Sequence, residues 1–286
     1  MYQGNRNSCR DLRVWLRALR VCWILIALLT ARAADAQSPR TLRLDYYHTG
    51  TATSEVFALD RLVVEPAPWP GNPARAVDDT NLGKYLFEVI DRASNRVVYS
   101  RGFASIFGEW ETTAEAATAA RTFHESLRFP MPSAPVQVVI KKRDRQNAFR
   151  EAWSITVDPS DRFIDRSSPP SPGAVLALLD NGDPATKVDL LILGDGYTAA
   201  ERGKFEKDAR RLVDILFAVE PFKSRKGDFN VWGLSPAAAE SGISRPSTGL
   251  HRRSPVGATY DAFGSERYVL TFENRAFRDV ACRAPY

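Results

Sequence analysis

Cysteine, histidine and methionine are all scarce in this 286-residue sequence, which holds three cysteines, three histidines and two methionines. Cys9 and Cys22 lie in an N-terminal segment that we expect to be removed, so Cys282 remains as a single thiol. One thiol can form neither an internal disulfide nor a cysteine-based zinc site. A hydrophobic core, without covalent cross-links, must therefore stabilise the processed protein.

The three histidines, His48, His124 and His251, include no pair at the spacing of metal ligands. His124-Glu125 begins like an H-E-x-x-H motif, but the position of the second histidine is Arg128, whose charge repels a metal ion. The residues around it alternate, which predicts a strand with His124 as a surface residue on its polar face. We therefore predict no catalytic, cofactor-binding or metal-binding residue in this chain.

The N-terminus has the pattern of a signal peptide, which we assign to residues 1–36. Five arginines precede an uncharged apolar run at 21–29, and Ala34-Asp35-Ala36 fits the small-x-small cleavage rule. The run is shorter than the roughly 20 residues that span a bilayer, although an uncleaved membrane anchor is the alternative. Cys22 precedes the run, which argues against a lipoprotein. We expect a secreted, periplasmic or cell-surface protein.

The basic character of the chain comes mostly from that segment. Residues 1–36 contain six arginines and two aspartates, so their removal lowers the formal net charge from +5 to about +1. A nearly neutral protein gives no electrostatic reason to expect nucleic acid as a partner. We likewise expect no membrane partner after cleavage.

Residues 40–158 read as an antiparallel β-sandwich, because short β-branched or aromatic runs alternate with turns. Runs at 85–90 and 96–100 flank a polar turn and predict a hairpin, as do runs at 136–140 and 152–157. We expect the proline-rich stretch at 66–73 to be a loop, since proline cannot occupy a central strand. Residues 159–186, rich in proline and serine, are predicted to be a linker between domains.

From residue 187 the pattern becomes strand–helix–strand, the start of an α/β domain. Residues 188–193 form a nearly continuous apolar run, typical of a strand covered on both faces. Thr198 and Glu201 form a capping box for a helix. That helix carries apolar residues at helical spacing, at 205, 209, 212, 213, 216 and 217, and a second strand is expected at 229–234.

The functional motifs that begin in this region are all incomplete. Gly194-x-Gly196 followed by a helix resembles a dinucleotide fingerprint, but no acidic residue closes the next strand, so a sharp turn is the better interpretation. Glu240-Ser241-Gly242 lacks the leading glycine of a nucleophile elbow, and Cys282 has no evident base. Arg252-Arg253 is better explained as a solvated loop than as an anion site.

Several longer runs resemble the bacterial IgA-peptidase-like zinc metallopeptidases, peptidase family M64. They occur at 188–198, 218–222, 228–232, 240–246 and 263–268, in the order of the family and over about 100 residues. The upstream β region is similar to the N-terminal domain of the family. By this resemblance the chain is α+β multidomain, and residues 187–286 are the incomplete beginning of an α/β metallopeptidase-like domain.

The resemblance implies a secreted zinc-dependent endopeptidase that acts on protein or peptide substrates. In the family an H-E-F-G-H-type helix holds zinc and supplies a glutamate base, which takes a proton from metal-bound water. No such helix occurs in these residues, so we expect a fragment that binds no zinc and is inactive, or a reading frame that continues past Tyr286. The alternative is a non-catalytic secreted module that binds protein or glycan, with Trp69 or Trp110 as anchors if these are exposed.

Overall fold

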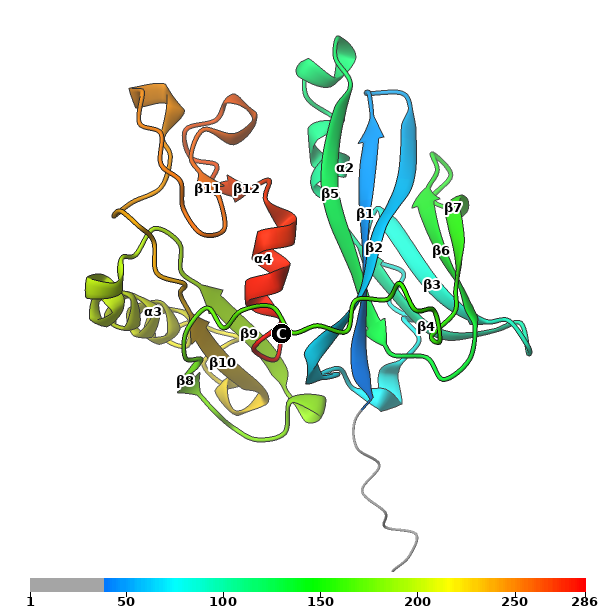
Figure 1. Ribbon diagram of the computed structural model, residues 1–286, viewed down its shortest axis with the longest axis horizontal. Coiled ribbons are helices and arrows are strands. Elements are labelled where there is room, and N and C mark those ends of the chain that lie inside the picture. Colours follow the sequence, from blue (N-terminus) through cyan, green and yellow to red (C-terminus); the bar gives the residue numbers. More distant parts are fainter. Residues whose placement is uncertain (1–38) are drawn as a thin grey trace, which may run out of the picture. The chain divides into compact units, whose positions relative to one another are not determined.

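The computed structural model describes residues 39–286 and is mostly β-sheet with few helices (Figure 1). The proposed signal peptide at 1–36 lies outside these residues and stays a prediction. Within residues 39–286, every helix is too short or too polar to cross a bilayer. Several of the sheets are antiparallel.

The first sheet has the order β2-β1-β5, with both neighbours antiparallel to β1. Its strands are β1 Arg40–Gly50, β2 Glu55–Pro68 and β5 Arg121–Pro130. Because side chains alternate along a strand, Leu42, Leu44 and Tyr46 point to one face and join the core, while Arg43 and Asp45 point to the other. The second face is also buried at Arg43 and Asp45, although both side chains are charged.

The second sheet has the order β4-β3-β6-β7. It is built from two hairpins, β3 Tyr85–Asp91 with β4 Arg96–Phe103 and β6 Val136–Arg143 with β7 Phe149–Val157. Both predicted hairpins are therefore confirmed. In the first turn Asn95 adopts a positive φ of 53°, and its amide donates to the Asp91 carbonyl at 2.8 Å.

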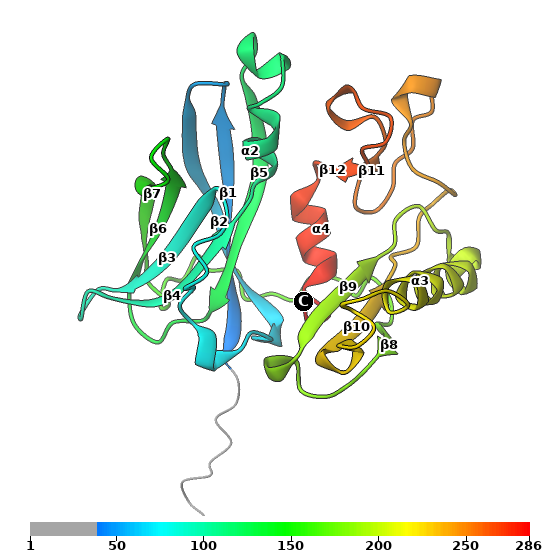
Figure 2. The ribbon, with the colours of Figure 1, turned by 180° about the vertical axis from the view of Figure 1, so that it is seen from behind.

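The first and second sheets lie side by side (Figure 1 and Figure 2). One cluster of buried apolar side chains draws from both of them. Leu44 and Tyr46 come from the first sheet, and Phe87, Val138 and Ile140 from the second. A short helix, α2 Ile106–Trp110, follows β4 and is capped by the Ser105 hydroxyl, which accepts from the Gly108 amide at 2.9 Å. This helix was not predicted. Its Trp110 is fully buried, so it is not an exposed anchor.

The expectation of a loop over 66–73 was wrong in its first part. Pro66 and Pro68 lie at the end of β2, which is an edge strand of its sheet. An edge position has one side without ladder hydrogen bonds, so a residue that lacks an amide hydrogen is tolerated there. The loop begins after Pro68, where the Trp69 amide donates to the Pro39 carbonyl at 2.7 Å.

The third sheet has the order β8-β10-β9 and contains the predicted strand–helix–strand unit. Its elements are β8 Leu176–Leu179, β9 Val188–Leu193, α3 Arg202–Leu216 and β10 Phe229–Leu234. β9 and β10 are parallel and are connected through α3. The capping box is confirmed, since the Thr198 amide donates to Glu201 Oε2 at 2.9 Å.

Two details of this unit differ from expectation. β9 is only partly covered within residues 39–286, and Val188 is 49% exposed. The reason is its place at the edge of the sheet, whereas α3 packs against β8 and β10. On α3, Phe205, Ala209 and Val213 are buried as predicted, but Leu212 is 47% exposed because it lies at the margin of the buried face.

The remaining chain forms a small pair of strands, β11 Ala258–Thr259 and β12 Leu270–Thr271, and the helix α4 Asn274–Ala281. The helix α4 was not predicted, and it packs against β5. Short 3-10 turns occupy Pro73–Arg75, Glu115–Ala117, Pro184–Thr186, Ala199–Glu201, Lys226–Asp228, Pro246–Thr248 and Ala262–Gly264. The division into domains with a linker at 159–186 stays a prediction.

Candidate functional site

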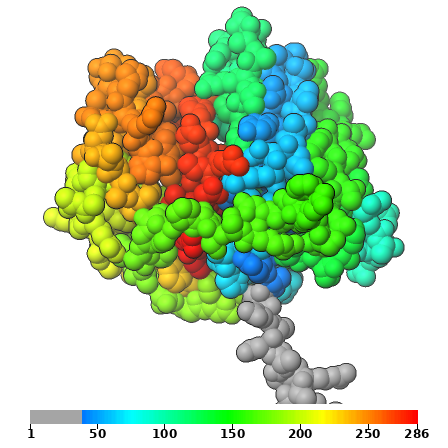
Figure 3. Space-filling model, in the orientation of Figure 1, coloured from blue at the N-terminus to red at the C-terminus, as the bar shows by residue number. Residues whose placement is uncertain are grey.

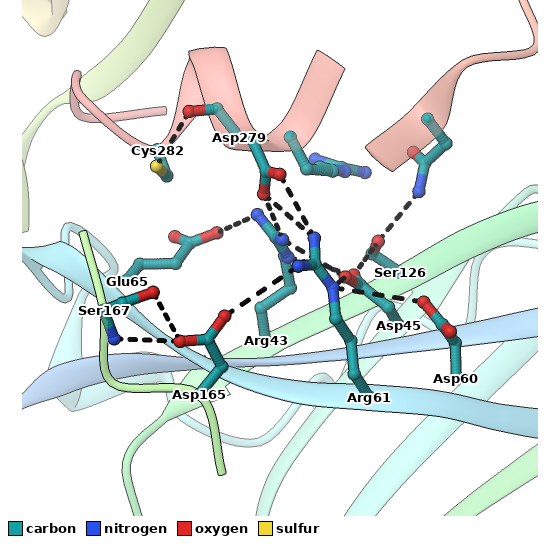
Figure 4. A network of polar contacts seen from close by, with 12 residues as sticks. Arg43, Asp45, Asp60, Arg61, Glu65, Ser126, Asp165, Ser167, Asp279 and Cys282 are labelled. Carbon is teal, nitrogen blue, oxygen red and sulfur yellow. Dashed lines mark hydrogen bonds and ion pairs between the residues drawn. The ribbon is translucent and has the colours of Figure 1, made fainter. Parts of the chain in front are cut away.

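The second face of the β2-β1-β5 sheet carries a network of charged side chains, which we call the arginine cluster (Figure 4). Arg43 on β1 is completely buried. Its Nε lies 2.9 Å from Asp45 Oδ1, and its Nη1 lies 3.6 Å from Glu65 Oε1. Arg61 on β2 donates from its Nε to Asp45 Oδ2 at 2.9 Å. Asp45 also accepts from the Ser126 hydroxyl at 2.5 Å.

Helix α4 completes this cluster from a distant part of the sequence. Asp279 Oδ1 accepts from Arg43 Nη2 at 2.6 Å and from Arg61 Nη2 at 3.0 Å. Next to it, Arg128 pairs with Glu65 at 2.7 Å and stacks on the Tyr286 ring at 3.7 Å. Figure 3 shows the red surface of α4 against the blue surface of the first strands. A helix from the C-terminal half thus contacts a charged face of the N-terminal half.

In the arginine cluster, the buried Arg43 guanidinium stays charged because carboxylates surround it. Burial alone would lower the pKa of the Arg43 guanidinium, but Asp45, Asp279 and Glu65 outweigh it and raise that pKa above the ordinary arginine value. Arginine is thus charged throughout the range in which proteins work. We conclude that Arg43 is a permanent cation at the centre of this contact.

Within residues 39–286, one group of side chains has ligand atoms close enough together for a metal ion: Asp45, Asp60 and His124. Both ring nitrogens of His124 already have partners, since Nε2 lies 3.1 Å from Asp60 Oδ2 and Nδ1 lies 3.0 Å from Asn274 Nδ2. The Arg61 guanidinium forms an ion pair with Asp45, and its Nε also lies 4.0 Å from Asp60 Oδ2. Because a cation already neutralises these carboxylates, the group does not fit a zinc ion.

His124 lies on β5 as predicted, but it is not a surface residue. Its side chain is only 11% exposed, because Asn274 of α4 covers it. His48 is fully buried on the other face of the same sheet, and His251 is exposed. Among residues 39–286, the one group of side chains spaced for a metal ion contains a single histidine, His124.

The other motifs have structural explanations. Gly196 has a φ of +76°, and a Cβ on Gly194 would lie 2.6 Å from the Phe205 ring, so both glycines serve the turn. Asp195 between them accepts from the Ser254 hydroxyl at 2.6 Å and from the Ala258 amide at 2.8 Å, which holds a distant loop.

The remaining candidate side chains are likewise engaged. Arg252 forms an ion pair with Glu240, and the Ser241 hydroxyl donates to Glu201 at 2.9 Å. Cys282 is buried, which raises the pKa of its thiol to about 11. A thiol with such a pKa is protonated near neutral pH, so it is a poor nucleophile.

Comparison with protein-family models gives two matches. The model of the IgA Peptidase M64 family matches residues 176–286, and the model of the Peptidase M64 N-terminus matches residues 34–154. A search among curated proteins found no match. Since the two models together cover most of the chain, it belongs to the M64 peptidases, a metallopeptidase family. The resemblance seen in the sequence is confirmed.

Proposed function

We propose that this chain is part of a secreted zinc-dependent endopeptidase, and that the zinc-binding motif of that enzyme lies outside these 286 residues. The observation that carries the proposal is the pair of family matches, which place the two characteristic regions of an M64 peptidase in one chain. The family indicates metal use and protein or peptide substrates. Delivery across the membrane by residues 1–36 is part of the proposal.

The domain arrangement that goes with this function has residues 40–158 as a β-sandwich, 159–186 as a linker and 187–286 as the beginning of an α/β catalytic domain. The core cluster shared by the two antiparallel sheets supports the first region, and the parallel pair β9 and β10 supports the last. We propose that the sandwich supports the catalytic domain through the arginine cluster. The α+β multidomain architecture follows from this arrangement.

A metal-binding experiment tests the proposal directly. The purified chain is incubated with Zn²⁺, passed over a desalting column and assayed for bound metal and for hydrolysis of a labelled protein substrate. We expect neither stoichiometric zinc nor proteolysis, because the Asp45–Asp60–His124 group is already neutralised by Arg61. One zinc per chain that disappears in His124→Ala would overturn the proposal, and His251→Ala is the matched control.

The second candidate is a non-catalytic module that binds protein or glycan. It needs exposed aromatic anchors, and the two tryptophans considered for that role do not provide them. Trp110 is buried, and Trp69 packs against Tyr99 with the ring centroids 5.4 Å apart. No observation favours this candidate over the peptidase. Reading the DNA downstream of Tyr286 for an H-E-x-x-H sequence would separate the two.

A further inference from the structure

A second set of buried charges lies on the core face of the β2-β1-β5 sheet, opposite the arginine cluster. We call it the histidine cluster, and its centre is His48 on β1, which is fully buried. His48 Nε2 lies 3.0 Å from Glu55 Oε2 on β2, and His48 Nδ1 lies 3.3 Å from Glu125 Oε2 on β5. Each ring nitrogen therefore faces a carboxylate, one from each neighbouring strand.

Two aromatic rings cover the faces of the same imidazole. Phe57 stacks at 4.2 Å with an interplanar angle of 27°, and Phe107 stacks at 3.9 Å with an angle of 25°. A cation between two ring faces is stabilised by their quadrupoles. Phe107 belongs to α2, so the imidazole also forms the contact between that helix and the sheet.

The two carboxylates have further partners that hold them in place. Glu125 accepts from the Tyr46 hydroxyl at 2.7 Å and from the Phe107 amide at 3.3 Å. Glu55 accepts from the Tyr85 hydroxyl at 2.9 Å and pairs with Lys142 at 3.0 Å. These bonds prevent the carboxylates from turning away from His48.

The outer charged groups of the histidine cluster are also paired. Glu111, which follows α2, pairs with Lys142 at 3.1 Å and with Lys84. On the other side of Tyr46, Arg278 of α4 lines the same cavity as the Tyr46 side chain. A protonated His48 with Lys142 and Lys84 thus balances Glu55, Glu125 and Glu111. Without the proton on His48, this set would carry a net negative charge.

A neutral imidazole cannot satisfy this geometry. It has one N–H donor, so one of its nitrogens would present a lone pair to a carboxylate at 3.0 or 3.3 Å. The imidazolium has two donors and satisfies both carboxylates at once. We propose that His48 is a protonation-dependent latch that fastens α2 to the sheet and releases it when the proton is lost.

The electrostatics agree in sign with this geometry. Burial alone would lower the pKa of His48, but its hydrogen bonds to Glu125 and Glu55 outweigh burial and raise it above the ordinary value of 6.5. The stabilisation is therefore complete below pH 6.5 and is lost as pH rises through the elevated pKa. For Glu55, burial is outweighed by His48 and Lys142, which lower its pKa to about 2, so its contribution persists above pH 4.5 and disappears toward pH 2.

Release of α2 would alter a neighbouring cavity of about 190 Å³. Ser105 and Ile106, at the start of α2, line this cavity together with Tyr46 and Glu125 of the histidine cluster. The latch therefore couples protonation to the size of a polar cavity at the edge of β5. At mildly acidic pH, His48 would stay protonated and the latch would stay fastened.

The test combines two measurements on the whole chain, and the presence of only three histidines makes it simple. NMR titration of the imidazole carbons should show His48 with a pKa above 6.5, and Glu125→Gln should lower that value. Hydrogen exchange, corrected for its intrinsic pH dependence, should show at least a tenfold loss of protection in residues 107–111 as pH rises through the His48 transition. Protection in β10 should not change, and His251→Gln should behave like the wild type.

Two results would overturn the proposal. One is a His48 imidazole that titrates at or below 6.5. The other is protection of α2 that stays constant between pH 5 and 9. If Glu125→Gln fails to fold, Glu55→Gln serves instead, because it removes the other of the two carboxylates and should likewise move the exchange transition to lower pH.

Discussion

Strand β1 carries two buried charge clusters on its two faces, and they are built on different principles. The arginine cluster joins β1 and β2 to α4, more than 200 positions away, and its central cation is charged at every working pH. The histidine cluster is confined to the N-terminal sheets and α2, and its central cation exists only while His48 is protonated. The same strand therefore presents a permanent contact on one side and a pH-dependent one on the other.

Replacing the central arginine should have the largest effect. Arg43→Met removes the buried cation that pairs with both Asp45 and Glu65, which then keep only Arg61 and Arg128 as cationic partners, so the free energy of unfolding should fall by about 3–5 kcal/mol. The loss should be equal at pH 5.5 and pH 8.5, as measured by urea denaturation. Arg150→Met is the control, since Arg150 is 74% exposed and its loss should cost less than about 0.5 kcal/mol. A loss for Arg43→Met that varies with pH would show that the arginine cluster is not a permanent contact.

The next effect concerns the histidine cluster. Glu125→Gln removes one of the two negative partners of His48 and should lower the free energy of unfolding by about 2–3 kcal/mol at pH 5.5. At pH 9 the loss should be smaller, because a neutral His48 no longer needs that charge. Denaturation curves at the two pH values check this. An equal loss at both would show that His48 is not protonated in the folded protein.

A smaller effect is expected where α4 meets the arginine cluster. Asp279→Asn should lower the free energy of unfolding by about 1–2 kcal/mol, because Asp279 is 31% exposed and Arg43 keeps Asp45 as a partner. Hydrogen exchange in residues 274–281 should accelerate, while exchange in α2 stays unchanged. A double-mutant cycle with Arg61→Met should show non-additivity. Additive losses would mean that the contact seen between these side chains contributes no coupling.

The smallest effect should come from the remaining half-buried histidine. His124→Gln should cost only about 0.5–1 kcal/mol, since its two hydrogen bonds, to Asp60 and Asn274, can be made by a neutral amide. A change in zinc retention on this substitution would show that the neighbouring carboxylates form a metal site after all.

Sequence patterns predicted the hairpins of the second sheet, the strand–helix–strand unit and its capping box, because these depend on local periodicity and turn chemistry. They missed α2 and α4, which are short and are stabilised by packing and not by their own propensity. The loop predicted from Pro66 was wrong because the edge position of β2 cannot be read from the chain alone.

The two charge clusters could not have been predicted from the sequence. Arg43 and Asp45 look like ordinary polar residues of a strand whose second face meets water. Burial of that face depends on Asp279 and its helix, far away along the chain. His48 occupies a core position by alternation with Leu44 and Tyr46, and this was the one available signal that a charged group lies inside.

The most direct test compares the pH dependence of two stability differences, wild type against His48→Gln and wild type against Arg43→Met, between pH 5.5 and 9. We expect the first difference to shrink as pH rises, by about 1.4 kcal/mol for each unit by which the pKa of His48 exceeds its unfolded value. The second difference should stay constant. Parallel behaviour of the two, with neither depending on pH, would contradict the distinction between a permanent and a protonation-dependent cluster.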